Sequence, residues 1–118
     1  MTPTSLPAGL VVDFLNTVDV EAGTDVLDDP RGFARWCRGH GTSPVDSASA
    51  RRLRDELRAM AAGERYRIDP IRIPLAASRD GGLAPAPTDV VEAICAAVMT
   101  LTATGDLARI KLCPADDC

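Results

Sequence analysis

Residues 46–61 read DSASARRLRDELRAMA, and this stretch decides the class of fold. Its apolar residues recur at steps of three and four, the spacing of one face of an α-helix: Ala50, Leu53, Leu57, Met60 and Ala61. Asp46 or Ser47 can cap the start of this helix, and Gly63 can end it. The pattern therefore predicts an amphipathic helix whose apolar side needs partner elements.

Three further segments are predicted to supply helical partners. In residues 10–18, Leu10, Phe14 and Val18 share one face, although the β-branched valines at 11 and 12 leave a strand possible. The Asp29-Pro30 pair is a good helix start, and residues 88–105 carry an apolar stripe that begins near Asp89 and ends at a glycine. We therefore expect about four helices.

A different pattern separates the last two helices. Asp80-Gly81-Gly82 is a turn signal between short apolar runs, which predicts a hairpin from Leu75 to Ala84. The predicted fold is mainly α: a single-domain helical bundle with this short β-hairpin insertion and a C-terminal half zinc knuckle.

The amino-acid composition excludes several classes of protein. The 118 residues are 46% hydrophobic and 25% charged, which fits one globular domain. The net charge of −4 argues against a nucleic-acid-binding surface on this domain. We find neither a run of about 20 apolar residues nor a secretory signal, so we expect no membrane partner, a cytoplasmic location and reduced cysteines.

Two groups of residues are candidates for chemistry: the arginines of residues 51–67 and the single histidine. The arginines of residues 51–67 are predicted to form the solvated face of a helix, with Arg51–Asp55 and Arg52–Glu56 pairs. The single histidine, His40, lies between two glycines, and we expect it to be exposed and mobile. A general base needs a fixed orientation, so the sequence predicts that the protein is not an enzyme and has no catalytic residues.

Cys113 and Cys118 are the candidate metal ligands. Four residues separate them, at the upper end of the spacing in structural zinc sites. Zinc prefers four ligands, so two cysteines make half a site, and two ordinary thiols remain the alternative. A homodimer in which each copy gives both cysteines would complete a four-thiolate site.

Asp13 and Asn16 are polar residues inside an apolar segment. If buried, they need hydrogen-bond partners. They could bond to nearby backbone, or they could form a small polar pocket with Trp36 and an arginine. The second interpretation predicts a ligand-binding site at Asp13, Asn16 and Trp36.

Four segments, in order, resemble a known family. Residues 10–18 (LVVDFLNTV) resemble the opening motif of the bacterial ABATE domain, the N-terminal part of CGNR zinc-finger proteins. Residues 29–41 and 51–58 are similar to its second helix and its arginine-rich third segment. Residues 106–118 (DLARIKLCPADDC) resemble the lead-in to its zinc finger.

The resemblance implies a stress-related transcription regulator. Residues 1–106 would be the ABATE-like helical domain, and residues 107–118 the incomplete start of a finger. Cys113 and Cys118 would be its first two zinc ligands. The second cysteine pair and an arginine-rich stretch that would contact DNA phosphates lie outside these 118 residues, so zinc could be absent and DNA would be bound only through that further part. The alternative is a small-molecule-sensing or protein-interaction module.

Overall fold

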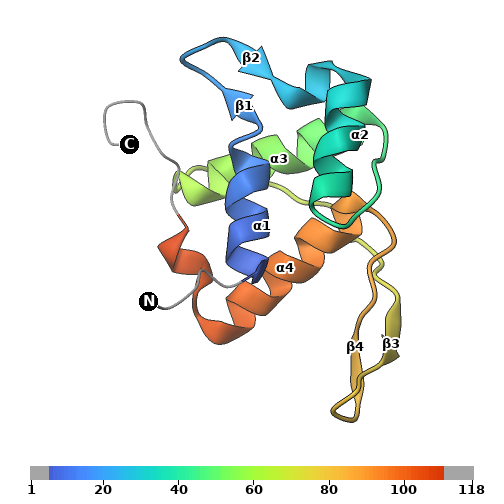
Figure 1. Cartoon of the computed structure of the whole chain (residues 1–118). Helices are drawn as coiled ribbons and strands as arrows, with labels where there is room; N and C mark the ends of the chain where they lie inside the picture. The colour runs from blue at the N-terminus through green and yellow to red at the C-terminus, as the bar shows by residue number, and fades with distance from the viewer. Residues whose placement is uncertain (1–5, 111–118) are drawn as a thin grey trace, which may run out of the picture.

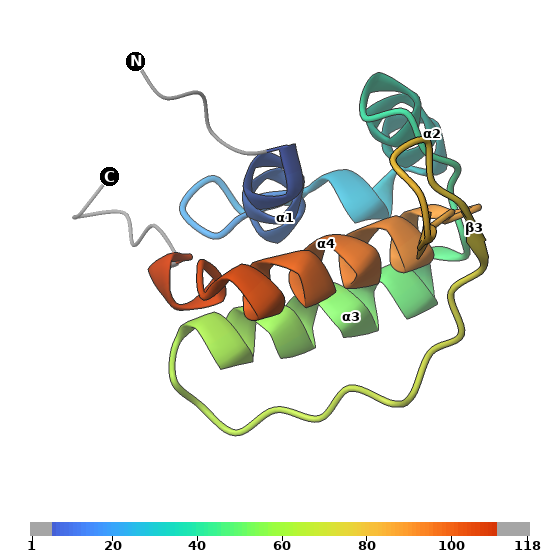
Figure 2. The same ribbon diagram turned by 90° about the horizontal axis from the view of Figure 1, so that it is seen from below.

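Four α-helices carry most of the structure. The computed structural model describes residues 6–110, and its helices are α1 (Leu6–Leu15), α2 (Pro30–Gly39), α3 (Ser47–Ala61) and α4 (Val90–Thr104). Figure 2 shows α4 between α1 and α3, with α2 beside one end of this group. The mainly α prediction is confirmed. None of the described helices is long and apolar enough to cross a membrane.

The core lies between the helices and is largely aliphatic. It contains two buried phenylalanines, Phe14 and Phe33, and α4 contributes small residues that allow close packing, Ala96 and Ala97. The 3-10 turn η2 (Leu107–Arg109) follows α4, and Leu107 and Ile110 pack against the same core. The predicted division at residue 106 stays a prediction.

Acidic caps start three of the helices. The carboxylates of Asp29, Asp46 and Asp89 accept backbone N–H groups in the first turns of α2, α3 and α4. These N–H groups have no partner within the helix, so each cap satisfies a donor. Glu92 completes the start of α4 by accepting from the Thr88 N–H at 2.8 Å. The caps agree with the predicted helix starts.

The first helix differs from its prediction at both ends. It starts at Leu6, because Pro7 fits the first turn, where no N–H is needed. It ends at Leu15 rather than at Val18, since Thr17 turns its hydroxyl back to the Phe14 carbonyl at 2.7 Å. The chain then forms the short antiparallel pair β1 (Val18–Asp19) and β2 (Thr24–Asp25), followed by the 3-10 turn η1 (Val26–Asp28).

The predicted hairpin is confirmed. Strands β3 (Leu75–Ala77) and β4 (Leu83–Pro85) pair antiparallel, and Ala76 lies opposite Ala84. The turn closes with the Ser78 N–H donating to the Gly82 carbonyl at 2.9 Å, and Gly81 has a φ of 93°. Glycine suits this turn because it adopts positive φ without strain. In Figure 1 the hairpin projects away from the helices.

The expectation of a solvated arginine face is wrong for three arginines of α3. Arg58 donates to the Leu15 carbonyl at 2.7 Å, and Arg54 to Asp25 at 2.6 Å. Arg51 pairs with Asp28 rather than with Asp55, the partner its spacing predicts. All three therefore fasten the segment from the end of α1 to η1 onto α3.

Removal of the Arg54 side chain should strongly destabilise the fold. Arg54 is 3% exposed, and its loss leaves the carboxylate of Asp25 in the interior without its main partner. We expect Arg54→Ala to lower the free energy of unfolding by about 3 kcal/mol in urea denaturation. Arg52→Ala, at an exposed position of the same helix, should change it by less than about 0.5 kcal/mol. Equal effects of the two substitutions would contradict a structural role for Arg54.

Candidate functional site

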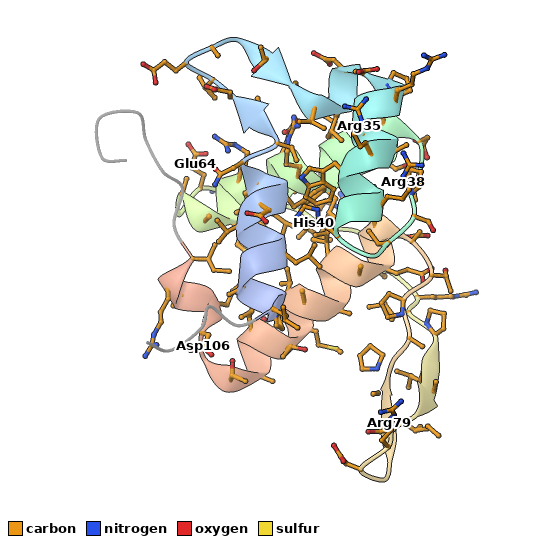
Figure 3. All side chains as sticks on the ribbon, viewed as in Figure 1. Arg35, Arg38, His40, Glu64, Arg79 and Asp106 are labelled. Carbon is orange, nitrogen blue, oxygen red and sulfur yellow. The ribbon has the colours of Figure 1, made fainter. Side chains whose placement is uncertain are left out.

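A cluster of polar and aromatic side chains lies between α1 and the end of α2. It consists of Asp13, Trp36 and His40. The Nε2 of His40 lies 3.1 Å from Oδ2 of Asp13, and its Nδ1 lies 2.8 Å from the Trp36 carbonyl oxygen. The imidazole stacks on the Trp36 ring with centroids 4.0 Å apart, and Phe14 extends this aromatic contact into the core. Figure 3 shows His40 in this position, between α1 and α2.

The expectation that His40 is exposed is wrong, because its side chain is only 25% exposed and both ring nitrogens face partners. His40 is the C-cap residue of α2, and its backbone N–H donates to the carbonyls of the last helical turn. Gly41, at a φ of 72°, then turns the chain away from the helix axis. Because His40 and Trp36 are four residues apart, the imidazole lies over the indole. The glycines around His40 therefore shape the end of the helix.

Both ring nitrogens of His40 face oxygen acceptors. These two contacts hold the imidazole over the Trp36 ring, so the cluster presents an imidazole, an aromatic face and a carboxylate side by side. The side chain of Asp13 is 58% exposed, which leaves the carboxylate open to a polar ligand.

The structure places the three predicted ligand-binding residues differently from the predicted pocket. Asp13 and Trp36 come together through His40, whereas Asn16 is exposed in the turn that follows α1. The polar partner of Asp13 is a histidine, not an arginine. Ligand binding at these residues stays a prediction. His40 is the residue that sequence reasoning missed, although its four-residue spacing from Trp36 was a usable signal.

The described cysteines are poor metal ligands. Desolvation raises the pKa of the buried Cys37 thiol. Desolvation and the nearby charge of Asp89 raise the pKa of Cys95 to about 11. Metals bind the thiolate, and burial disfavours this charged form at both positions. Cys113 and Cys118 lie outside the described residues, and within residues 6–110 no three His, Cys, Asp or Glu side chains gather to hold a metal ion.

A second polar cluster surrounds Arg54. Desolvation raises the pKa of Asp25, but hydrogen bonds from Arg54 and the Leu27 N–H, with the charges of Arg54 and Arg51, outweigh it and leave this pKa below its ordinary value. Asp25 also caps η1 through the same Leu27 N–H, at 2.9 Å. This cluster is an internal structural ion pair, because the side chain of Arg54 is 4% exposed and that of Asp25 is 13% exposed.

The lowered pKa of Asp25 makes stability depend on pH in acid. Its stabilising contribution is complete above the ordinary carboxyl pKa and is lost as the pH falls through the lowered one. Asp25→Asn should therefore destabilise at neutral pH, and its thermal unfolding midpoint should approach that of the wild type as the pH decreases. Asp69→Asn, at an exposed position, should leave the wild-type pH profile unchanged. A constant gap between wild type and Asp25→Asn at every pH would refute the ion-pair assignment.

The structure has two further surface features, an apolar cavity and a row of exposed arginines on α2. An apolar cavity of about 390 Å³ lies among α1, α3, α4 and η2, with Leu15, Leu57 and Ile110 in its wall. On α2, Arg31, Arg35 and Arg38 are exposed, and among residues 6–110 none of them has an acidic partner within 4.0 Å. Figure 3 shows Arg35 and Arg38 on this helix. These three charges are the basic face of an otherwise acidic chain.

Comparison with protein-family models matches residues 8–115 to ABATE, whose description is "Putative stress-induced transcription regulator". The chain belongs to the ABATE family. The match covers α2, α3 and α4 in full and α1 from Ala8 onward, so the resemblance noted from the sequence motifs is confirmed. Searches of curated proteins and of solved structures returned no match.

Proposed function

We propose that this ABATE protein regulates transcription and contacts DNA through a zinc-dependent element that begins at Cys113 and Cys118. The family description supports the regulatory role. The net charge of −4 and the engagement of Arg51, Arg54 and Arg58 in contacts within the fold support a helical domain that accompanies the DNA-binding element. Phosphate contacts dominate affinity for DNA, and these three arginines are not available for them.

Zinc binding follows from the same proposal. Burial disfavours the thiolate form of Cys37 and Cys95, which supports Cys113 and Cys118 as the cysteines that bind the metal. Two ligands hold zinc weakly, so the other two would come from a second copy or from a further cysteine pair. The isolated chain is thus proposed to bind zinc weakly or as a dimer that shares it.

The decisive experiment compares cysteine variants in the native host. We expect chromatin immunoprecipitation of the tagged protein to enrich particular promoters, and Cys113→Ser or Cys118→Ser to abolish this enrichment. The same substitutions should lower the zinc content of the purified protein, measured by mass spectrometry. Cys95→Ser is the matched control, and it should retain both promoter enrichment and zinc.

Two results would contradict this proposal. Enrichment at no promoter, under stress or without it, would exclude regulation through DNA. Enrichment that survives Cys113→Ser but disappears in Arg35→Gln and Arg38→Gln would move the DNA contact to the basic face of α2.

A second candidate function is small-molecule sensing, favoured by the Asp13–His40–Trp36 cluster. An open carboxylate, a stacked imidazole and an indole together can bind a small polar ligand with an aromatic or cationic part. Such a ligand would bridge α1 and α2.

Thermal-shift screening of metabolites tests this sensing function. A true ligand should raise the unfolding midpoint of the wild type, and Asp13→Asn should remove most of that rise. Glu64→Gln, an exposed carboxylate outside the cluster, should leave the rise intact. If no compound stabilises the wild type, or if Asp13→Asn responds like the wild type, the candidate fails.

A further inference from the structure

The basic face of α2 gathers positive charge where the chain has no acidic residue. Residues 30–45 contain Arg31, Arg35 and Arg38 but no aspartate or glutamate. Steps of four and three residues set the three arginines on one side of the helix, opposite its two buried residues. In the part of the chain that the structure describes, none of the three guanidinium groups forms an ion pair within 4.0 Å.

The carboxylates around α2 already have partners. The Val90 N–H donates to the Ser43 carbonyl, so the start of α4 lies beside the loop that follows α2. Three of the neighbouring carboxylates cap helices and the fourth pairs with Arg51: Asp29, Asp46, Asp89 and Asp28. Charges are screened over about 8 Å at physiological ionic strength. An approaching anion therefore responds mainly to the arginines of α2, and less to the net charge of −4.

The other exposed arginines without an ion pair are isolated charges. They are spread over α3, the loop after it and the hairpin: Arg52, Arg65, Arg72 and Arg79. Each has an acidic residue within four positions of the chain: Glu56, Glu64, Asp69 and Asp80. Opposite charges this close weaken the attraction of an anion. The three arginines of α2 differ because they combine like charges on one face.

This face lacks the apolar residues that a protein partner would cover. Protein interfaces have a core of apolar and aromatic side chains surrounded by a polar rim. None of the exposed large apolar side chains of residues 6–110 belongs to α2. Trp36 is half-buried beneath the imidazole of His40. A row of arginines without such a core favours a partner that presents charge alone, as the phosphates of a nucleic acid do.

We propose that the basic face of α2 binds the phosphate backbone of DNA, as a contact additional to the element at Cys113 and Cys118. The inference rests on the proposed function, because a regulator of transcription brings α2 close to a duplex. From Arg31 to Arg38 the helix rises about 10 Å. This length matches about three phosphate steps of one strand, each of about 3.4 Å along the duplex axis.

The chemistry of arginine suits this contact. A planar guanidinium group can donate two parallel hydrogen bonds to one phosphate. Contacts of this kind position a protein on a duplex without reading its sequence. Figures 1 and 2 place α2 and η2 at opposite ends of the molecule. Substitutions on α2 therefore act at a distance from Ile110, from which the chain continues to Cys113.

The test measures binding to a labelled random-sequence duplex by fluorescence anisotropy at several salt concentrations. Cys113→Ser/Cys118→Ser protein with a chelator serves as the background, so that contacts made through zinc are removed. We expect weak binding, and the logarithm of the association constant should fall with the logarithm of the salt concentration with a slope of about −2.7, or about −0.9 for each phosphate contact. Arg35→Gln/Arg38→Gln should reduce the slope to about −0.9 and weaken binding at low salt at least about tenfold.

Two further variants separate the face of α2 from the charge of the whole chain. Arg72→Gln/Arg79→Gln removes the same charge elsewhere and should retain the wild-type slope. Arg35→Lys/Arg38→Lys keeps both charges on α2 and should retain most of the slope. Circular dichroism checks that each variant is folded, and the amide NMR signals that shift when the duplex is added should centre on α2.

Three results would overturn the proposal. The first is no binding at any salt concentration, and the second is an equal loss of slope in the two glutamine double variants. The third is a glutamate-rich peptide that binds α2 as tightly as the duplex does, which would assign this face to an acidic protein. None of these results bears on promoter enrichment that depends on Cys113 and Cys118.

Discussion

The ion pair between Arg54 and Asp25 holds the irregular segment between α1 and α2 against helix α3. The segment from Asn16 to Asp28 contains two strands of two residues and one 3-10 turn, and it contributes one fully buried large side chain, Leu27. Such a segment buries too little apolar surface to order itself. Arg54 reaches into it from the rigid helix α3, and Arg51 and Arg58 secure its two ends.

The contacts that Arg51, Arg54 and Arg58 make with this segment also set the position of α2. Because η1 leads directly into the Asp29 cap, the segment held by Arg54 fixes where α2 begins. The other end of α2 is held by His40 against Asp13 of α1. Two polar contacts at opposite ends of one ten-residue helix thus complement its apolar anchors, Phe33 and Cys37. The basic face of α2 is directed outward as a consequence.

Local patterns predicted the fold better than the site. The helix starts at Asp29, Asp46 and Asp89 and the turn at Gly81 follow from chemistry within a few residues, and these predictions hold. The contacts of the α3 arginines could not be predicted in this way. The partner of Arg54 lies 29 residues away, and helical spacing indicated the nearer Asp55 and Glu56 as partners for the arginines instead. The contact of His40 with Asp13, 27 residues away, was likewise invisible to local spacing. The zinc prediction rests on Cys113 and Cys118, which lie outside the described residues.

The stack of His40 on Trp36 gives the protein a built-in optical probe. Trp36 is the only tryptophan in the chain, and its ring touches both an imidazole and the core residue Phe14. Its fluorescence therefore originates from a single place, the junction of α1 and α2. Any event that separates these two helices will change the emission without a label, whereas events at the hairpin will leave it unchanged.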